Sequence, residues 1–420
     1  MRRRRQGRVD TRSELLSLLT EACELEHGLA CTYLFAAFSL KDGAQDGLGW
    51  EDQQRARRWA AQLYFVASQE MLHLAQAWNL LAAIGGTPYY GRPNFPQGAR
   101  YYPLDLPFEL RPFSLETLDR FIKFEAPEEQ ANRLRCQIRH GAPVDDEEFD
   151  YSTVGELYSL IESGFENIPE ETLFVGTRSA QIDAAFVHFP DILRVVDRDS
   201  ARKAIAAIKA QGEGTRQDHI DCHFGIFRAI RDELAGTRLP AGGFARACAP
   251  NPVTRVRPDQ ISAPSRTGGQ AVTVITHPSS LELGMLFDDL YGLMLRMLAY
   301  VFARGDARAR WLEEVCRVAI EMMVMCLKPL GEALAMLPLE RPDSEARAGA
   351  PFALSRVVLL PSSPATAHQL IVERLGDLAA VADEAASRVG VRFPDVGPRL
   401  ARIGPALRRY GRMLDAAACP

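Results

Sequence analysis

The stretch Ser68-Gln69-Glu70-Met71-Leu72-His73 places two ionisable side chains on the apolar side of a predicted helix. The positions on that side follow steps of three and four residues, namely Trp59, Leu63, Val66, Glu70, His73, Ala77, Leu80 and Ile84. This is the core-facing period of a bundle helix, so Glu70 and His73 stand where Leu or Ala is expected. A metal ion would remove the cost of burying the carboxylate, because it pairs with the charge and the lone pairs. Glu-x-x-His also puts both side chains one turn apart on one face, as in bundles that bind two metal ions.

A second predicted helix, over residues 11–40, has a carboxylate at an equivalent position. Its apolar side consists of Leu15, Leu19, Ala22, Glu26, Leu29 and Tyr33, again in steps of three and four. The helix that contains Glu70 covers about residues 52–84 and ends at a Gly-Gly-Thr-Pro stop signal. Because the connection between these helices is short, we expect antiparallel neighbours with Glu26 opposite Glu70 and His73.

The third helix of a four-helix bundle is predicted from weaker patterns. A crossover rich in Pro, Gly and aromatic residues covers residues 89–113, and the short helix over 114–126 has Glu125 on its apolar side. A further helix over 153–168 has Glu156 off its apolar side. Periodicity therefore favours Glu125 as the carboxylate of the third helix.

The fourth helix lacks a contiguous Glu-x-x-His motif. Glu213 and His223 are ten residues apart rather than three, and removal of seven residues, about two helical turns, would restore the spacing. We therefore expect an insertion between Gly214 and the helix over 217–235 to loop out, leaving both residues facing one site. His219, one turn before His223, is the rival ligand.

The composition bounds the class of protein. The 420 residues are 47% hydrophobic and 25% charged, with a net charge of −5, so the chain can bury a large core. No clustered basic surface indicates a nucleic acid, and no apolar run is long enough to span a membrane. No apolar segment follows the arginines at residues 2–5, which favours a disordered basic tail over 1–10 rather than a secretion signal. The eight cysteines contain no Cys-x-x-Cys pair, so we expect reduced thiols in a cytoplasmic protein.

Composition also divides the chain into regions. Residues 237–280 are rich in Pro, Gly and Ser and predict a linker with one β-like run. Further helices are predicted over about 280–304, 308–337, 364–388 and 395–416. We therefore expect a bundle at 11–236 and a C-terminal helical region at 281–420 packed on it.

Several of these motifs resemble the ferritin-like domain of the iminophenyl-pyruvate dimer synthase family. They are Leu25-Glu26-His27, Glu70-Met71-Leu72-His73 leading to Ile84-Gly85-Gly86-Thr87-Pro88, Phe124-Glu125-Ala126-Pro127-Glu128, Val154-Gly155-Glu156-Leu157-Tyr158, and Gln211-Gly212-Glu213-Gly214 followed by His223-Phe224. The resemblance covers about residues 12–355 and implies a ferritin-like four-helix bundle. It points to Glu156 as the third-helix carboxylate, so Glu125 and Glu156 both remain candidates. In this interpretation, their segments are the two halves of one interrupted helix.

Named members of that family act in violacein- and rebeccamycin-type pathways, where they couple two imines derived from an oxidised aromatic amino acid. They are much longer, with an additional large region that this sequence lacks, so the resemblance transfers the fold rather than the exact reaction.

The sequence therefore predicts an all-α protein with a ferritin-like bundle and a di-metal centre. The proposed ligands are Glu26, Glu70, His73, Glu125 or Glu156, Glu213 and His223, with His27 and Tyr33 as supporting groups. Two iron ions are expected, with manganese as the alternative. The leading hypothesis is an oxidase or oxygenase that uses O2 on a small amino-acid-derived molecule in natural-product biosynthesis.

Two alternatives remain open at this stage. One is an imine-coupling or dimerising enzyme like the named relatives. The other is a non-catalytic scaffold or binding protein whose polar core is structural, since a lone buried Glu is more often in a structural ion pair. Neither a nucleic acid nor a membrane is expected as a partner, and a homo-oligomer is left open.

Overall fold

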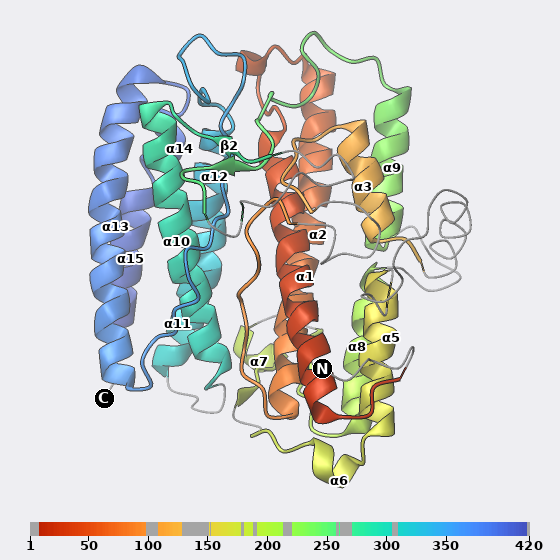
Figure 1. The fold of residues 1–420 in the computed structure, drawn as a ribbon. Helices are drawn as coiled ribbons and strands as arrows, with labels where there is room; N and C mark the ends of the chain where they lie inside the picture. The colour runs from red at the N-terminus through yellow and green to blue at the C-terminus, as the bar shows by residue number, and fades with distance from the viewer. Residues whose placement is uncertain are drawn as a thin grey trace.

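Two long antiparallel helices form the centre of the molecule. The structure, a computed structural model, describes residues 8–97, 108–127, 151, 153–177, 180–187, 191–212, 221–257, 260, 271–304 and 310–417. Helix α1 (Arg12–Ser39) begins at a capping box formed by Thr11 and Glu14. Helix α2 (Trp50–Ala83) follows a short 3₁₀ turn, η1 (Ala44–Asp46), and packs along α1 (Figure 1). The predicted antiparallel pair is confirmed.

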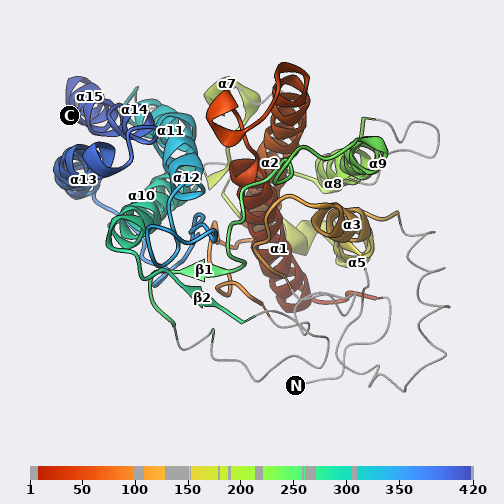
Figure 2. The same cartoon turned by 90° about the horizontal axis from the view of Figure 1, so that it is seen from above.

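The other two helices of the bundle are each broken into two pieces. One consists of α3 (Leu115–Phe124) and α5 (Val154–Asn167), and the other of α8 (Arg198–Gly212) and α9 (His223–Gly236). Figures 1 and 2 show α3 stacked on α5 and α9 stacked on α8, all on one side of α1 and α2. The two predicted segments of the third helix are therefore halves of one interrupted helix. The fourth helix is interrupted at the same level.

Hydroxyl and thiol caps mark where the broken pieces begin. The Ser114 side chain accepts a hydrogen bond from the Thr117 backbone at the start of α3, and Thr153 does the same for Glu156 in α5. Helix α9 begins at His223 with Cys222 as its cap, and the predicted start at residue 217 lies outside the described residues. The helix ends that meet at the two breaks, at Glu125, Val154 and Gly212, lie beside Glu26 and Glu70 of α1 and α2.

The C-terminal helices cover the opposite side of α1 and α2 (Figure 2). They are α10 (Pro278–Phe302), α11 (Arg310–Met322), a π-helical segment (Met323–Leu327), α12 (Lys328–Leu334), α13 (Pro364–Arg392), α14 (Gly397–Leu400) and α15 (Ile403–Ala416). A continuous apolar core joins them to the bundle. Helices α1 and α2 are therefore the middle layer of three.

The helix predicted over residues 308–337 is not regular throughout. Its turns change from α to π geometry at Met323–Leu327 before α12 begins. Pro329 lies in the first turn of α12 and has no N–H to donate to the carbonyl of residue 325. The π-helical segment thus lies between Met322, where the regular α-helix ends, and the turn that contains this proline.

Short elements connect the layers. Strands β1 (Pro252–Val253) and β2 (Thr273–Val274) pair in parallel within the predicted linker. Helices α6 (Glu170–Leu173) and α7 (Ala184–Val187) have four residues each and were not predicted. Within the described part of the chain, no helix combines the length and apolar character needed to cross a bilayer.

Candidate metal centre

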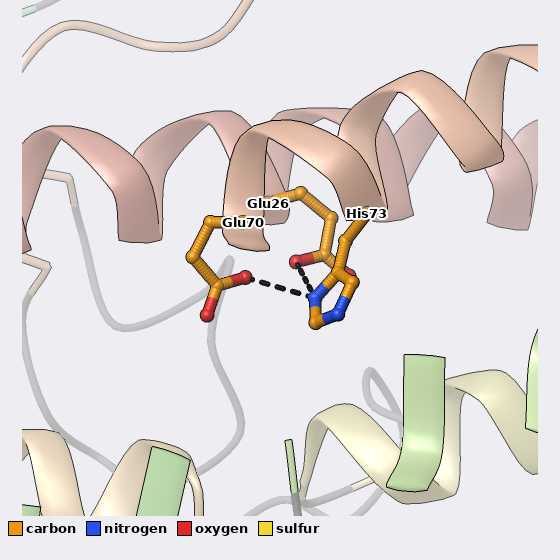
Figure 3. A group of neighbouring side chains, drawn as sticks. All are labelled: Glu26, Glu70 and His73. Atoms are coloured by element: carbon orange, nitrogen blue, oxygen red, sulfur yellow. Dashed lines mark hydrogen bonds and ion pairs between the residues drawn. The ribbon is translucent and has the colours of Figure 1, made fainter. Parts of the chain in front are cut away.

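The continuous helices supply one half of a buried carboxylate–histidine cluster. Glu26 comes from the middle of α1, and Glu70 and His73 come from α2 (Figure 3). The His73 Nδ1 atom lies 3.2 Å from Glu70 Oε2 and 3.6 Å from Glu26 Oε2. All three side chains are buried. The two helices thus place these residues opposite one another, as their sequence spacing predicts.

The interrupted helices supply the other half. Glu125 is the residue directly after α3, and His223 is the first residue of α9. The His223 Nδ1 atom lies 2.7 Å from Glu70 Oε1 and 3.6 Å from Glu125 Oε2. Glu70 therefore faces His73 with one carboxylate oxygen and His223 with the other. Two groups of three candidate ligands share this one carboxylate, which is the position of a bridging ligand.

Two glutamine amides fix the orientation of the imidazole rings. The Nε2 atom of His73 lies 2.9 Å from Gln211 Oε1, and that of His223 lies 3.1 Å from Gln69 Oε1. Because an amide oxygen only accepts hydrogen bonds, each Nε2 atom carries a proton. Each Nδ1 atom then points its lone pair at the carboxylates when the ring is neutral, which is the form that binds a metal.

Two tyrosine hydroxyls hold the outer carboxylates. Tyr33 donates a hydrogen bond to Glu125 Oε1, and Tyr158 donates one to Glu26 Oε1 at 2.6 Å. In each carboxylate the other oxygen, Oε2, is the one that approaches a histidine. The predicted supporting position of Tyr33 agrees with this contact. Tyr158, on the inner face of α5, is not among the predicted supporting groups.

Without a metal ion, protons and ion pairs must balance the buried charge. Burial and the nearby Glu70 carboxylate raise the pKa of Glu26 to about 8. Burial acts to lower the pKa of His223, but Glu70 and Glu125 outweigh it and raise that pKa to about 9. Burial also acts to raise the pKa of Glu70, yet the two histidines hold it below its usual range. Glu26 and His223 therefore retain protons, which balance the negative charge that bound cations would otherwise neutralise.

The donor set fits a pair of divalent cations. Three buried atoms, Glu26 Oε2, Glu70 Oε1 and His223 Nδ1, have no hydrogen-bond partner. The close approach of Glu70 Oε1 to His223 Nδ1 is thus an ion-pair distance without the alignment of a hydrogen bond. Carboxylate and imidazole donors around a cavity of about 10 Å³ suit iron or manganese.

The remaining predicted residues divide into those that lie elsewhere and those outside the described residues. Glu156 is half-buried in the first turn of α5 and belongs to neither group of candidate ligands, whereas Glu125 belongs to one of them. Residues two apart on a helix point to different sides, so Tyr158 rather than Glu156 faces Glu26. Glu213 and His219 lie outside the described residues, and their roles stay predictions.

His27 does not support the candidate ligands, and this prediction was wrong. Its Nδ1 atom lies 2.8 Å from the Tyr90 carbonyl oxygen, and its Nε2 atom contacts the Tyr291 hydroxyl. Consecutive residues on a helix point about 100° apart, since one turn takes 3.6 residues. Glu26 therefore faces the cluster while His27 faces the C-terminal helices.

A four-helix bundle that gathers carboxylates and histidines around one buried space is the architecture of carboxylate-bridged metal proteins. The ferritin-like family model matches residues 19–232, and the chain belongs to this family. A crystal structure of a ferritin-like protein from Caulobacter vibrioides is also similar, with 20% identity and a TM-score of 0.45 over 74% of this chain and 95% of that chain.

Two curated relatives extend the match beyond the bundle. Dichlorochromopyrrolate synthase of Lentzea aerocolonigenes is 28% identical in an alignment 364 positions long that covers 79% of this chain and 35% of that protein. The 2-imino-3-(indol-3-yl)propanoate dimerase of Chromobacterium violaceum is 28% identical in an alignment 360 positions long that covers 79% of this chain and 33% of that protein. The chain thus spans about a third of the length of these relatives. The predicted family resemblance is confirmed.

Proposed function

We propose that this protein is a biosynthetic enzyme that couples two imines derived from an aromatic amino acid, with a di-metal centre at the carboxylate–histidine cluster. The observation that carries the di-metal centre is the position of Glu70, whose two oxygens face two different histidines. Bound iron or manganese would supply Lewis-acid and redox chemistry there.

The protein's own residues would prepare the site for that chemistry. Gln69 and Gln211 hold the imidazole rings in the ligand orientation. Tyr33 and Tyr158 each occupy one oxygen of an outer carboxylate and leave the other oxygen for the cation. Burial of the cluster excludes bulk water, which strengthens electrostatic interactions inside it.

The coupling reaction is supported by the relatives. One of them is named as a synthase and the other as a dimerase of 2-imino-3-(indol-3-yl)propanoate. Each match covers 79% of this chain. Because the chain spans only about a third of each relative, the complete activity and its substrates are part of the proposal.

A product assay tests the coupling reaction. The purified protein is loaded with iron and given an aromatic 2-imino acid, generated in place from the amino acid by an amino-acid oxidase with catalase present. A new carbon–carbon bond between the two imines replaces one C–H bond of each, and dissolved O2 is the two-electron oxidant that takes up the two hydrogens. We therefore expect a product with the mass of two substrates less two hydrogens, and its loss in the Glu70→Gln variant. A yield of this product no higher than without the protein would overturn the proposal.

The O2-activating oxidase or oxygenase is the second candidate. The observation in its favour is the donor set itself, since carboxylates and imidazoles around two cations also serve non-haem iron chemistry. The same assay distinguishes the two reactions. An oxygenase yields an oxidised monomer instead of a joined product.

A further inference from the structure

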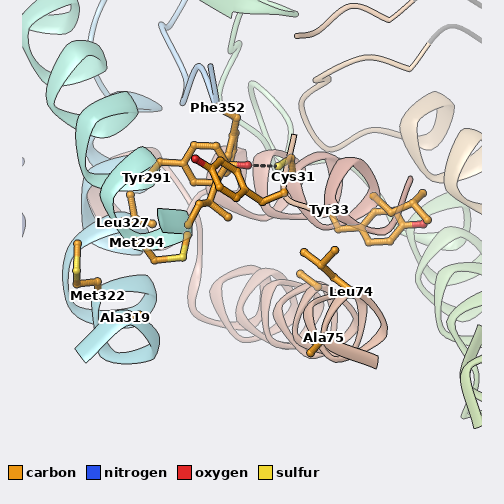
Figure 4. Close-up of a cluster of buried hydrophobic side chains, with 14 of the residues drawn as sticks. Cys31, Tyr33, Leu74, Ala75, Tyr291, Met294, Ala319, Met322, Leu327 and Phe352 are labelled. Carbon is orange, nitrogen blue, oxygen red and sulfur yellow. Dashed lines mark hydrogen bonds between the residues drawn. The ribbon is translucent and has the colours of Figure 1, made fainter. Parts of the chain in front are cut away.

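A second cavity lies on the opposite side of α1 and α2 from the carboxylate–histidine cluster. It has a volume of about 300 Å³, at the lower end of the range for small-molecule sites. Its walls come from α1 and α2 on one side and from α10, α11 and the π-helical segment on the other. Figure 4 shows Leu74 and Ala75 of α2 across this space from Met294 and Leu327. None of the candidate metal ligands among the described residues lines it.

Aromatic rings form part of the otherwise aliphatic walls of this cavity. They include Phe38, Trp78, Phe287, Phe302 and Phe352. Ring faces and edges of this kind pack well against a flat aromatic molecule. Flexible methionines complete the walls, and their side chains adapt to irregular ligand shapes.

The inner end of the cavity offers no spare hydrogen bond. His27 donates from Nδ1 to the Tyr90 carbonyl, so its Nε2 atom accepts the proton of the Tyr291 hydroxyl. The Tyr291 oxygen in turn lies 3.1 Å from Cys31 Sγ and 3.3 Å from an Arg92 nitrogen. The Tyr291 hydroxyl that lines the cavity is thus already hydrogen-bonded, so the part of a ligand that reaches it is apolar.

The outer end of the cavity carries a positive charge. Val324, which lines the cavity, is 61% exposed and marks its opening. Lys328 lies beside it, with Nζ 4.5 Å from the centre of the Tyr64 ring. Its ion pair with Glu332 is loose at 3.9 Å, whereas Tyr64 donates to the same carboxylate at 2.8 Å. The ammonium group is therefore placed to pair with an anion at the opening.

The π-helical segment gives an independent indication of a site. Three of its residues, Met323, Val324 and Leu327, line the cavity. Single π-helical turns within α-helices occur frequently at functional sites. Here the change of pitch directly precedes Lys328, the residue that supplies the charge.

We propose that this cavity binds an aromatic monocarboxylate, with its ring system between α2 and α10 and its carboxylate at Lys328. The charge at the opening selects the anion, and the walls select the aromatic body. The inference goes beyond the proposed function, because it requires neither a metal ion nor a reaction at the carboxylate–histidine cluster.

Calorimetric titration of the full chain with 2-naphthoate and with neutral 2-naphthamide tests the proposal. We expect both probes to bind the parent protein. Leu298→Trp, which fills the cavity from α10, should lower the affinity for both probes by more than about tenfold, because the larger side chain leaves no room for the naphthalene ring. If that variant does not fold, Cys316→Phe fills the same space from α11. Unchanged affinity in a folded cavity-filled variant would overturn the proposal.

The charge at the opening has its own test. Lys328→Gln should lower the affinity for 2-naphthoate by about two- to fivefold, the range expected for a partly exposed ion pair. The affinity for 2-naphthamide should not change. Lys203→Gln on α8, an exposed lysine paired with Asp199, is the matched control and should change neither. Equal effects of Lys328→Gln on both probes would contradict the role of the charge. Glu70→Gln should bind 2-naphthoate normally, so failure of the metal centre and failure of this site are distinguishable.

Discussion

The two halves of the carboxylate–histidine cluster come from helices of different kinds. Glu26, Glu70 and His73 lie within the long uninterrupted helices α1 and α2. Glu125 and His223 lie at helix ends, one directly after α3 and the other at the first position of α9. We call these the continuous half and the interrupted half of the site, with Glu70 facing ligands of both.

The comparison teaches how each half is held in place. In the continuous half, backbone hydrogen bonds on both sides of each residue fix the helix and therefore the direction of the side chain. Tyrosine and glutamine side chains contact both halves, but in the interrupted half a helix continues on only one side of each residue. The contacts of Tyr33 with Glu125 and of Gln69 with His223 therefore contribute more to fixing the side chains there. Helix ends open locally at lower free energy than helix interiors. We therefore expect the interrupted half to be the more adaptable side of the site.

Removing the shared carboxylate should have the largest effect. Glu70→Gln deprives both groups of a ligand, so we expect metal affinity to fall by more than about a hundredfold, beyond the loss of orienting partners alone. Metal analysis after dialysis measures this, with the exposed Glu51→Gln on α2 as the control. Iron should also raise the Tm of the parent protein but not that of the variant. A Tm indifferent to iron in both would favour a structural polar core.

Removing one histidine at a time should separate the two halves. We expect His73→Ala and His223→Ala each to bind about one fewer iron per chain than the parent, because each histidine belongs to a different group of three. Anaerobic iron titration, followed by optical spectra after adding air, measures the stoichiometry. A parent protein that takes up no more iron than His73→Ala would refute the continuous half.

Removing a tyrosine hydroxyl should have a smaller effect. Tyr158→Phe frees the outer oxygen of Glu26, and Tyr33→Phe frees that of Glu125. We expect about 10- to 100-fold weaker metal binding with an unchanged number of ions, as is typical for groups that orient ligands. A larger effect for Tyr33→Phe would show that the interrupted half depends more on tertiary contacts. Equal losses of metal affinity in Tyr33→Phe and Tyr158→Phe would contradict this difference between the two halves.

The last prediction concerns Asp288, which lies outside the carboxylate–histidine cluster. Its ionisation should change the stability of the fold with pH without changing metal binding. Burial raises the pKa of Asp288 on α10 to about 7 from 3.8, so the folded state prefers the protonated form. The destabilisation is absent below pH 4 and grows as pH rises towards 7. Asp288→Asn mimics the protonated form and should be more stable than the parent at pH 8 but not at pH 4. The gain should stay below the roughly 4 kcal/mol that corresponds to a pKa rise from 3.8 to about 7, because the variant loses the ion pair with Arg257. Urea unfolding at both pH values measures this, and a pH-independent difference would contradict it.

The continuous half was predictable because its information is local. Glu26, Glu70 and His73 occupy core positions in a regular repeat of three and four residues, and the short connection sets the two helices antiparallel. The same reasoning favoured Glu125 over Glu156, and the structure brings Glu125 into the cluster. The family resemblance pointed to Glu156, because sequence similarity aligns segments without indicating which side chain of a turn faces inwards.

The sequence by itself determined the fold class, the family and the three candidate ligands of the continuous half, since helical periodicity depends on residues that are close together in the sequence. Only the tertiary structure decided that Tyr158 holds Glu26 and that two glutamine amides orient the histidines. It also decided that His27 turns away towards a separate aromatic cavity. These features depend on which segments meet across the interrupted helices and the third layer. Residue spacing along one helix does not predict these contacts between distant segments.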